Sequence, residues 1–256
     1  MSALKIHQFA CRSDNFGVLI HDEASGLTAS IDAPEAAAVQ QALKQTGWRL
    51  TYILTTHHHG DHVDGNLELK SATGASIIGP RGEAAKIPGI DTLVGGGETV
   101  AFGSLQASVL DTPGHTLGHI SYWFEDATVA FVGDTLFSLG CGRVIEGDPQ
   151  MMWASLRTLM QLPAETSFHC GHEYTEANAR FALGIEPGNS ALQTRAAEVS
   201  ALRAAGKPTL PSTIGAELAA NPFLRPQSPE IRQRLGLVDK PDWQVFAEIR
   251  DRKNKS

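Results

Sequence analysis

Histidine and aspartate recur in this chain directly after apolar segments that have the pattern of buried strands. The stretch TTHHHGDHVDG, residues 55–65, places four histidines and an aspartate in six consecutive positions, and it follows the strand-like run RLTYILTT. The later segments PGHTLGH, FVGD and HCGH each follow an apolar run in the same way. A fold of this chain must therefore carry four groups of ligand-type side chains at the ends of strands.

The first group is able to serve two centres, because side chains alternate along a strand. His57 and His59 are two residues apart and point to the same face, whereas His58 points to the opposite face. Asp61 and His62 follow as the chain leaves the strand, and they turn toward a second point close by. One loop thus offers ligands to two neighbouring centres.

The residue types in these groups indicate metal binding. Neutral imidazole and carboxylate are the ligands that zinc, iron and manganese accept. Two histidines and one carboxylate leave coordination positions open for water, which is typical of a catalytic site. A surface loop that is rich in histidine by chance is the alternative, and the three further groups at strand ends argue against it.

The order of predicted elements indicates an α+β chain of two domains. Residues 3–32 predict three successive strands, and residues 34–47 predict a helix. After about residue 173 the pattern changes to helices that are punctuated by proline and glycine. We expect a metal-binding catalytic domain at residues 1–173 and a smaller, all-helical substrate-binding domain at residues 174–256.

The composition favours a globular protein and excludes several partners. Hydrophobic residues make up 42% of the 256 residues, and no stretch approaches the roughly 20 apolar residues of a spanning helix. The net charge of −7 argues against nucleic acid as the general partner. Three widely spaced cysteines do not form a disulfide pattern, so we expect free thiols and a cytoplasmic protein with no membrane partner.

The motifs THHHGDH, PGHTLGH, FVGDTLF and CGHEYT resemble those of the metallo-β-lactamase superfamily. The segments NPFLR and IRDRK extend the resemblance to nearly the whole chain and make it most similar to glyoxalase II, the hydroxyacylglutathione hydrolases. This resemblance implies a four-layer αββα sandwich with a helical C-terminal domain. It also implies a site for two divalent metal ions, zinc or alternatively iron or manganese, at one edge of the β layers.

The resemblance further implies the metal ligands and the reaction. A metal-bridging hydroxide would attack the thioester of an S-(2-hydroxyacyl)glutathione such as S-D-lactoylglutathione, releasing glutathione and a 2-hydroxy acid in the detoxification of methylglyoxal. Asp134 would bridge both ions, and Asp61 would also orient or deprotonate the water. We expect a monomer. The implied ligands are His57, His59 and His115 for the first ion, and Asp61, His62 and His172 for the second.

Glutathione carries two carboxylates, so its binding site should offer cations and hydrogen-bond donors. By resemblance the candidates are Arg143, Tyr174, Arg250 and Lys253. The chain departs from the family pattern at Arg143 and Ile145, where many members have a lysine and a tyrosine, so a cation is kept and a phenol is lost. The segment IDAPEA likewise replaces a more usual Asp-Pro-Gly.

Other functions of the same fold remain alternatives. The main one is an iron-dependent glutathione persulfide dioxygenase, which would consume oxygen. Hydrolases of β-lactams, lactones or nucleic acids are disfavoured by the helical tail and the acidic front half. A non-catalytic metal-binding module is disfavoured because seven ligands for two metals leave positions free.

The remaining histidines and cysteines have simpler interpretations. His7 and His21 are expected in ordinary strand positions. His58, His119 and His169 are expected in packing or supporting positions near the ligands. Cys141 and Cys170 are expected in packing positions.

Overall fold

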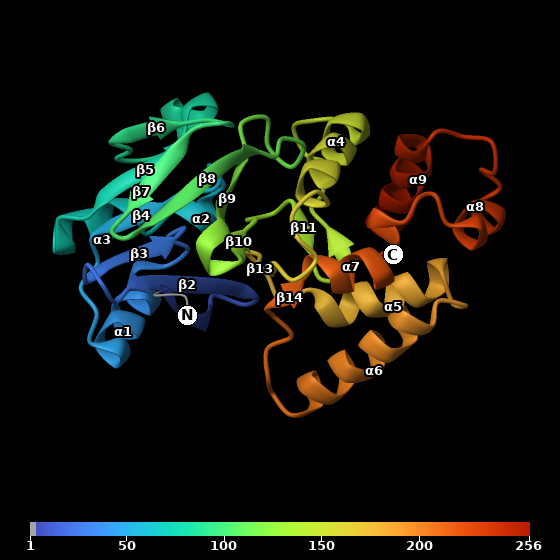
Figure 1. The fold of residues 1–256 in the computed structure, drawn as a ribbon, viewed down its shortest axis with the longest axis horizontal. Helices are drawn as coiled ribbons and strands as arrows, with labels where there is room; N and C mark the ends of the chain where they lie inside the picture. Colours follow the sequence, from blue (N-terminus) through green and yellow to red (C-terminus); the bar gives the residue numbers. More distant parts are fainter. Residues whose placement is uncertain (1–3) are drawn as a thin grey trace. The chain divides into compact units, whose positions relative to one another are not determined.

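The chain folds into two compact units, as seen in a computed structural model that describes residues 4–256 (Figure 1). Residues 1–3, which open the predicted first domain and the predicted first strand, lie outside the described residues. Unit 1 comprises Met1–Asp111 and Thr116–Gly133, and unit 2 comprises Thr112–His115 and Asp134–Ser256. The predicted domain boundary between residues 173 and 174 stays a prediction.

Unit 1 begins with a six-stranded mixed sheet whose strands follow one another in chain order. The first three strands pair antiparallel and the last four pair parallel, and parallel neighbours need a crossover connection. Helices α1 (Ala36–Thr46) and α3 (Asn66–Thr73) supply two of these crossovers. The strands are β1 (Leu4–Cys11), β2 (Asn15–Asp22), β3 (Leu27–Ile31), β4 (Tyr52–Leu54), β5 (Ser76–Pro80) and β6 (Thr92–Val94).

A second group of antiparallel strands packs on this sheet within unit 1. It contains β7 (Thr99–Phe102), β8 (Leu105–Asp111), β9 (Ile120–Phe124) and β10 (Val129–Phe131), paired in that order. A core that includes Ile20, Leu54 and Phe131 joins the two groups of strands. Their sequence neighbours point the other way, so that Leu19 and Ile53 pack with the helices. Unit 1 thus has a helical layer followed by two strand layers.

Unit 2 is mainly helical. A short hairpin of β11 (Leu136–Phe137) and β12 (Gly140–Cys141) opens it, and β13 (Ser167–His169) pairs with β14 (Ser212–Thr213). Several helices begin with side-chain caps, for example Asp148, whose carboxylate accepts from the Met151 N–H. The helices are α4 (Pro149–Leu159), α5 (Thr175–Ile185), α6 (Ser190–Ala204), α7 (Ile214–Ala220), α8 (Pro229–Leu235) and α9 (Asp242–Asn254).

The succession of elements agrees with the sequence patterns. The predicted helix over residues 34–47 is α1, which ends at Gly47 with a left-handed φ of 73° and an N–H bonded to the Leu43 carbonyl. Helices dominate from Thr175 onward, as the change of pattern predicts. Among the described residues, no helix has both the length and the apolar character that crossing a membrane requires.

Candidate metal centre

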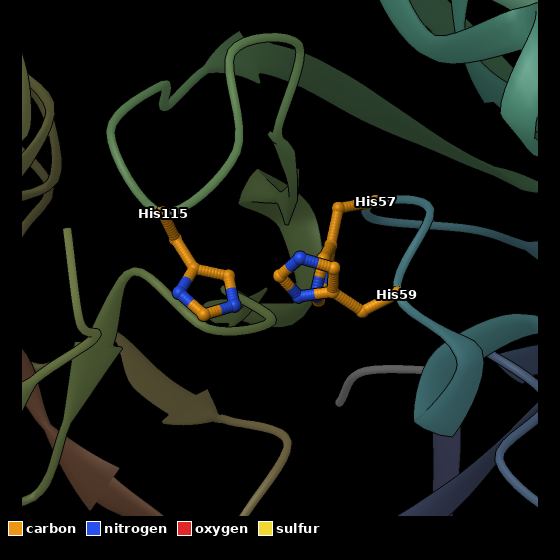
Figure 2. Close-up of side chains that lie close together, drawn as sticks. All are labelled: His57, His59 and His115. Carbon is orange, nitrogen blue, oxygen red and sulfur yellow. The ribbon is translucent and has the colours of Figure 1, made fainter. Parts of the chain in front are cut away.

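The loop after β4 carries the first and third histidines of the cluster, His57 and His59, whose ring nitrogens lie close together. His57 and His59 each bring a ring nitrogen to within 4.8 Å of the other, and their ring centroids are also 4.8 Å apart. Figure 2 shows both rings leaving this loop. His58 between them is held elsewhere, because the Glu83 carboxylate lies 2.8 Å from both the backbone nitrogen and the ring Nδ1 of His58. The contacts with Glu83 therefore separate His58 from its two neighbours, in a loop that lies beyond the end of β4 at Leu54.

The helix α2 (Gly60–Val63) follows at once and carries Asp61 and His62. The His62 Nε2 lies 3.7 Å from an Asp61 carboxylate oxygen, and the rings of His57 and His62 have centroids 4.1 Å apart. All four ligand-type side chains of unit 1 thus gather at the end of β4. Because these residues are so close in sequence, the loop after β4 and the first turn of α2 are enough to bring them together.

Buried polar residues from distant segments orient this group. The Asp32 carboxylate lies 2.7 Å from the His62 Nδ1 and accepts from the N–H and hydroxyl of Thr56. The Asn15 amide donates to an Asp61 carboxylate oxygen at 3.1 Å. An imidazole that donates Nδ1–H to a carboxylate presents the lone pair of Nε2 to a metal. The supporting roles of Asp32 and Asn15 were not predicted from the sequence. The unusual segment IDAPEA, which contains Asp32, was the feature that could have indicated one of them.

Unit 2 holds its own three ligand-type side chains together. The same oxygen of Asp134 lies 3.4 Å from the His115 Nε2 and 3.3 Å from the His172 Nε2, and all three residues are buried. The His115 Nδ1 lies 2.8 Å from the Arg143 carbonyl oxygen, so it is the donor nitrogen and Nε2 is the acceptor. His115 lies on the loop after β8, where Figure 2 shows its ring.

This geometry fits a divalent metal. The His115 Nε2 and an Asp134 carboxylate oxygen lie 3.4 Å apart, and both atoms can bind a metal ion. Ligands at about 2.1 Å from a tetrahedral ion lie roughly 3.4 Å apart. Imidazole and carboxylate are also the donor types of zinc, iron and manganese. The donor set and its spacing therefore both suit a metal centre.

The predicted substrate residues of unit 2 lie among gathered cations. Burial lowers the pKa of the Lys253 ammonium, and the charges of Arg250, Arg180 and Arg143 lower it further. Lys253 donates to the Ala177 carbonyl on α5 and lies over the Phe181 ring. Arg143 is exposed, whereas Arg180 is a cation that the sequence analysis missed. Unit 2 thus concentrates positive charge beside the start of α5.

Tyr174 and Arg250 make contacts of different kinds. The Tyr174 ring stacks on the His172 ring with centroids 4.7 Å apart and planes 3° from parallel. Arg250 is only 7% exposed, and its Nη1 donates to the Cys141 carbonyl at 2.8 Å. Its guanidinium also lies over the Phe223 ring. The substrate role of Arg250 stays a prediction, and the observed contacts give it a structural one.

The other histidines and the cysteines are packed. The His21 ring stacks on Trp48, and the His119 ring stacks on His57. Burial lowers the pKa of His169 to about 4, which keeps that imidazole neutral. All three thiols are free and buried, and burial raises the pKa of Cys141 to about 11. A thiol with that pKa is not a nucleophile at neutral pH.

Two family models together match almost the whole chain. The metallo-β-lactamase superfamily model matches residues 25–172, and the model of the hydroxyacylglutathione hydrolase C-terminus matches residues 173–256. The first match confirms the predicted α+β metallo-β-lactamase fold. Together with the histidine and aspartate groups it indicates a centre that binds divalent metal.

Curated relatives and solved structures agree with these matches. A hydroxyacylglutathione hydrolase of Brucella anthropi is 60% identical over 98% of this chain and 96% of its own length, and one of Brucella ovis is 60% identical over 98% of each chain. The crystal structure of ETHE1 from Myxococcus xanthus is 26% identical, covers 98% of this chain and 100% of its own, and has a TM-score of 0.68. The chain belongs to the hydroxyacylglutathione hydrolases, the glyoxalase II family, within the metallo-β-lactamase superfamily.

Proposed function

We propose that this chain hydrolyses the thioester bond of S-(2-hydroxyacyl)glutathione compounds such as S-D-lactoylglutathione. The products are glutathione and a 2-hydroxy acid, and the reaction completes the detoxification of methylglyoxal. The observation that carries this proposal is the 60% identity to curated hydroxyacylglutathione hydrolases along 98% of the chain. That likeness includes the helical residues 173–256, which have their own hydrolase family model.

The proposed centre holds two divalent ions, with zinc first and iron or manganese as alternatives. His57, His59 and His115 would hold one ion, Asp61, His62 and His172 would hold the other, and Asp134 would be shared by both. When bound, the ions supply a water of lowered pKa and a Lewis acid beside the thioester carbonyl. The arrangement is supported by the ligand groups within each unit and by the Nδ1 partners of His62 and His115, which direct Nε2 toward a metal.

The residues of the chain then have separate tasks. Asp61, which the Asn15 amide holds in place, orients the attacking water. Asp134 places one carboxylate oxygen near the Nε2 atoms of both His115 and His172, where it would share the metal ions with them. The leaving glutathione thiolate needs little help from a general acid, because a thiol has a pKa of about 8.5. The proposed catalytic residues are therefore Asp61 and Asp134.

Glutathione binding is assigned to the cations of unit 2. Arg143, Lys253 and the newly recognised Arg180 suit the two carboxylates of the peptide, because charge-assisted hydrogen bonds to carboxylates are the strong ones. Tyr174 adds a phenol that is 37% exposed. Arg250 is the fourth predicted residue. Only 7% of its surface is exposed, so a ligand can contact less of this side chain than of the others. We also propose that the protein is a cytoplasmic monomer, in keeping with its three free thiols.

The decisive experiment measures thioester cleavage by protein whose metal content has been quantified. Purified protein that carries close to two metal ions per chain should hydrolyse S-D-lactoylglutathione, and chelation should abolish the activity. Oxygen uptake with glutathione persulfide should stay at background. Fast oxygen uptake without thioester cleavage would overturn the hydrolase in favour of the persulfide dioxygenase.

A further inference from the structure

The hairpin loop between Asp134 and Arg143 receives several hydrogen bonds from side chains in or next to the helices of unit 2. The Asn221 amide donates to the carbonyls of Phe137 and Gly140, at 3.2 and 2.9 Å. The Asn178 amide donates to the Ser138 carbonyl at 3.2 Å, and Arg250 donates to the Cys141 carbonyl. The loop contains Leu139 at a φ of 55°, a conformation that costs a non-glycine residue energy and must be imposed by its surroundings.

Glu217 on α7 is the centre of this support. Its carboxylate is buried and has four donors. One oxygen accepts from the hydroxyls of Ser138 and Ser212 at 2.9 and 2.6 Å. The other accepts from the Leu139 N–H at 2.7 Å and from the Asn221 amide at 3.0 Å. A buried carboxylate with this many donors fixes the groups that donate to it, because leaving any of them unpaired is costly.

The supported loop lies against two of the proposed metal ligands, Asp134 and His115, at its C-terminal end. A side-chain carbon at Gly142 would overlap the Asp134 carbonyl oxygen, so the loop passes directly against that residue. One residue further on, the Arg143 carbonyl lies 2.8 Å from the His115 Nδ1. A shift of the loop would therefore move the acceptor that sets the tautomer and orientation of His115, and it would also move the Arg143 side chain.

We propose that Glu217 is a positioning residue that fixes the loop at residues 137–143 and, through the Arg143 carbonyl, the metal-binding orientation of the His115 ring. Glu217 acts through the loop and touches neither the ligands nor the substrate. The inference rests on the proposed metal centre but not on the identity of the thioester, so retention of metal tests it separately from turnover.

Two serines offer a matched test, because each gives one hydroxyl to the same Glu217 oxygen. Ser138 lies in the loop, whereas Ser212 lies in β14 and outside it. Ser138→Ala should speed the loss of zinc to a chelator and lower kcat/KM for S-D-lactoylglutathione by about tenfold, because ligand orientation changes. Ser212→Ala removes a hydrogen bond to the same Glu217 oxygen and should leave both values near those of the unaltered protein, apart from a lower melting temperature.

Substitution of Glu217 itself gives the larger effect. Glu217→Leu removes all four acceptor contacts and should lower kcat/KM roughly a hundredfold while releasing zinc faster, since small misplacements in a site have effects of this size. Glu217→Gln should restore both values to within a fewfold, because its NH₂ group can face the serine hydroxyls, which also accept hydrogen bonds. Its oxygen then still receives the Leu139 N–H.

The outcomes separate positioning from stability and from the proposed reaction. Equal behaviour of Ser138→Ala and Ser212→Ala, or unchanged zinc retention in a folded Glu217→Leu protein, would overturn the inference. If Glu217→Leu does not fold, the serine pair decides. If the unaltered protein holds zinc but cleaves no thioester, the proposed function fails, and the chelator measurements still decide the role of Glu217.

Discussion

The Asp32 carboxylate accepts the Nδ1–H of His62 at 2.7 Å, although the two residues are separated by thirty positions in sequence. The same carboxylate accepts from the Thr56 N–H at 2.7 Å and from its hydroxyl at 2.9 Å. Asp32 adopts a left-handed φ of 57°, which turns its side chain toward the end of β4. One buried carboxylate thus fixes both the strand end and the ring that follows it.

Asp32→Asn should weaken metal binding without unfolding the protein. Asparagine tolerates the left-handed backbone, but its NH₂ group must face a donor, either the His62 Nδ1–H or the Thr56 N–H. The expected result is a loss of metal affinity of about 10- to 100-fold, measured by competition with a chelator. Asp126→Asn, at an exposed position of the η2 turn (Glu125–Ala127), is the control and should retain metal normally.

Asp22 should make the protein less stable in acid. Burial raises the pKa of its carboxyl, but hydrogen bonds from the Ser104 N–H and from the hydroxyls of Ser25 and Ser104 outweigh it and lower the pKa to about 2. Because the folded pKa lies below the unfolded value, this stabilisation is complete above about pH 4 and is lost as the pH falls toward 2.

The measurement is the free energy of unfolding in urea as a function of pH. Asp22→Asn should be less stable than the unaltered protein at pH 7 by on the order of 2 kcal/mol. The difference between the two proteins should shrink as the pH falls from 5 to 2. A difference that stays constant over that range would show that the Asp22 charge is not what stabilises the fold.

The gathering of histidine and aspartate side chains after β4 could be predicted because these residues are close in sequence. His58 points away from His57 and His59 as a strand period predicts, although the three residues lie in the loop after β4. The next turn brings Asp61 and His62 to the same place. The overall α+β class follows for the same reason, from periodicity within short segments. Short-range rules are therefore enough for the fold class and for this grouping of side chains, whereas the role of each residue as a ligand stays a prediction.

The supporting residues could not be predicted, because they come from distant segments. Glu83 reaches His58 across 25 positions from the η1 turn (Arg81–Lys86), and nothing near Glu83 marks it as a partner. Arg250 had the pattern of an exposed cation near a helix end, but it is buried against the Cys141 carbonyl. Contacts between segments depend on how the elements pack, which sequence periodicity does not specify.

Lys253→Ala should weaken glutathione binding while leaving the metal in place. The loss of one charge-assisted hydrogen bond is expected to raise KM for S-D-lactoylglutathione about tenfold, with little change in kcat. Lys255→Ala is the matched control on the same C-terminal segment, because Lys255 is exposed and paired with Asp251. Equal KM values for the two variants would show that Lys253 does not contribute to glutathione binding.

Ile145→Tyr should improve substrate affinity. The family resemblance implies a tyrosine at this position, and the Ile145 side chain is 57% exposed, so a larger ring fits without repacking a core. A phenol that donates one hydrogen bond to the peptide should lower KM roughly three- to fivefold. Ile145→Phe adds the ring without the hydroxyl and separates stacking from hydrogen bonding. If both variants lower KM equally, the gain comes from apolar contact, and the phenol donor is not what this chain lacks.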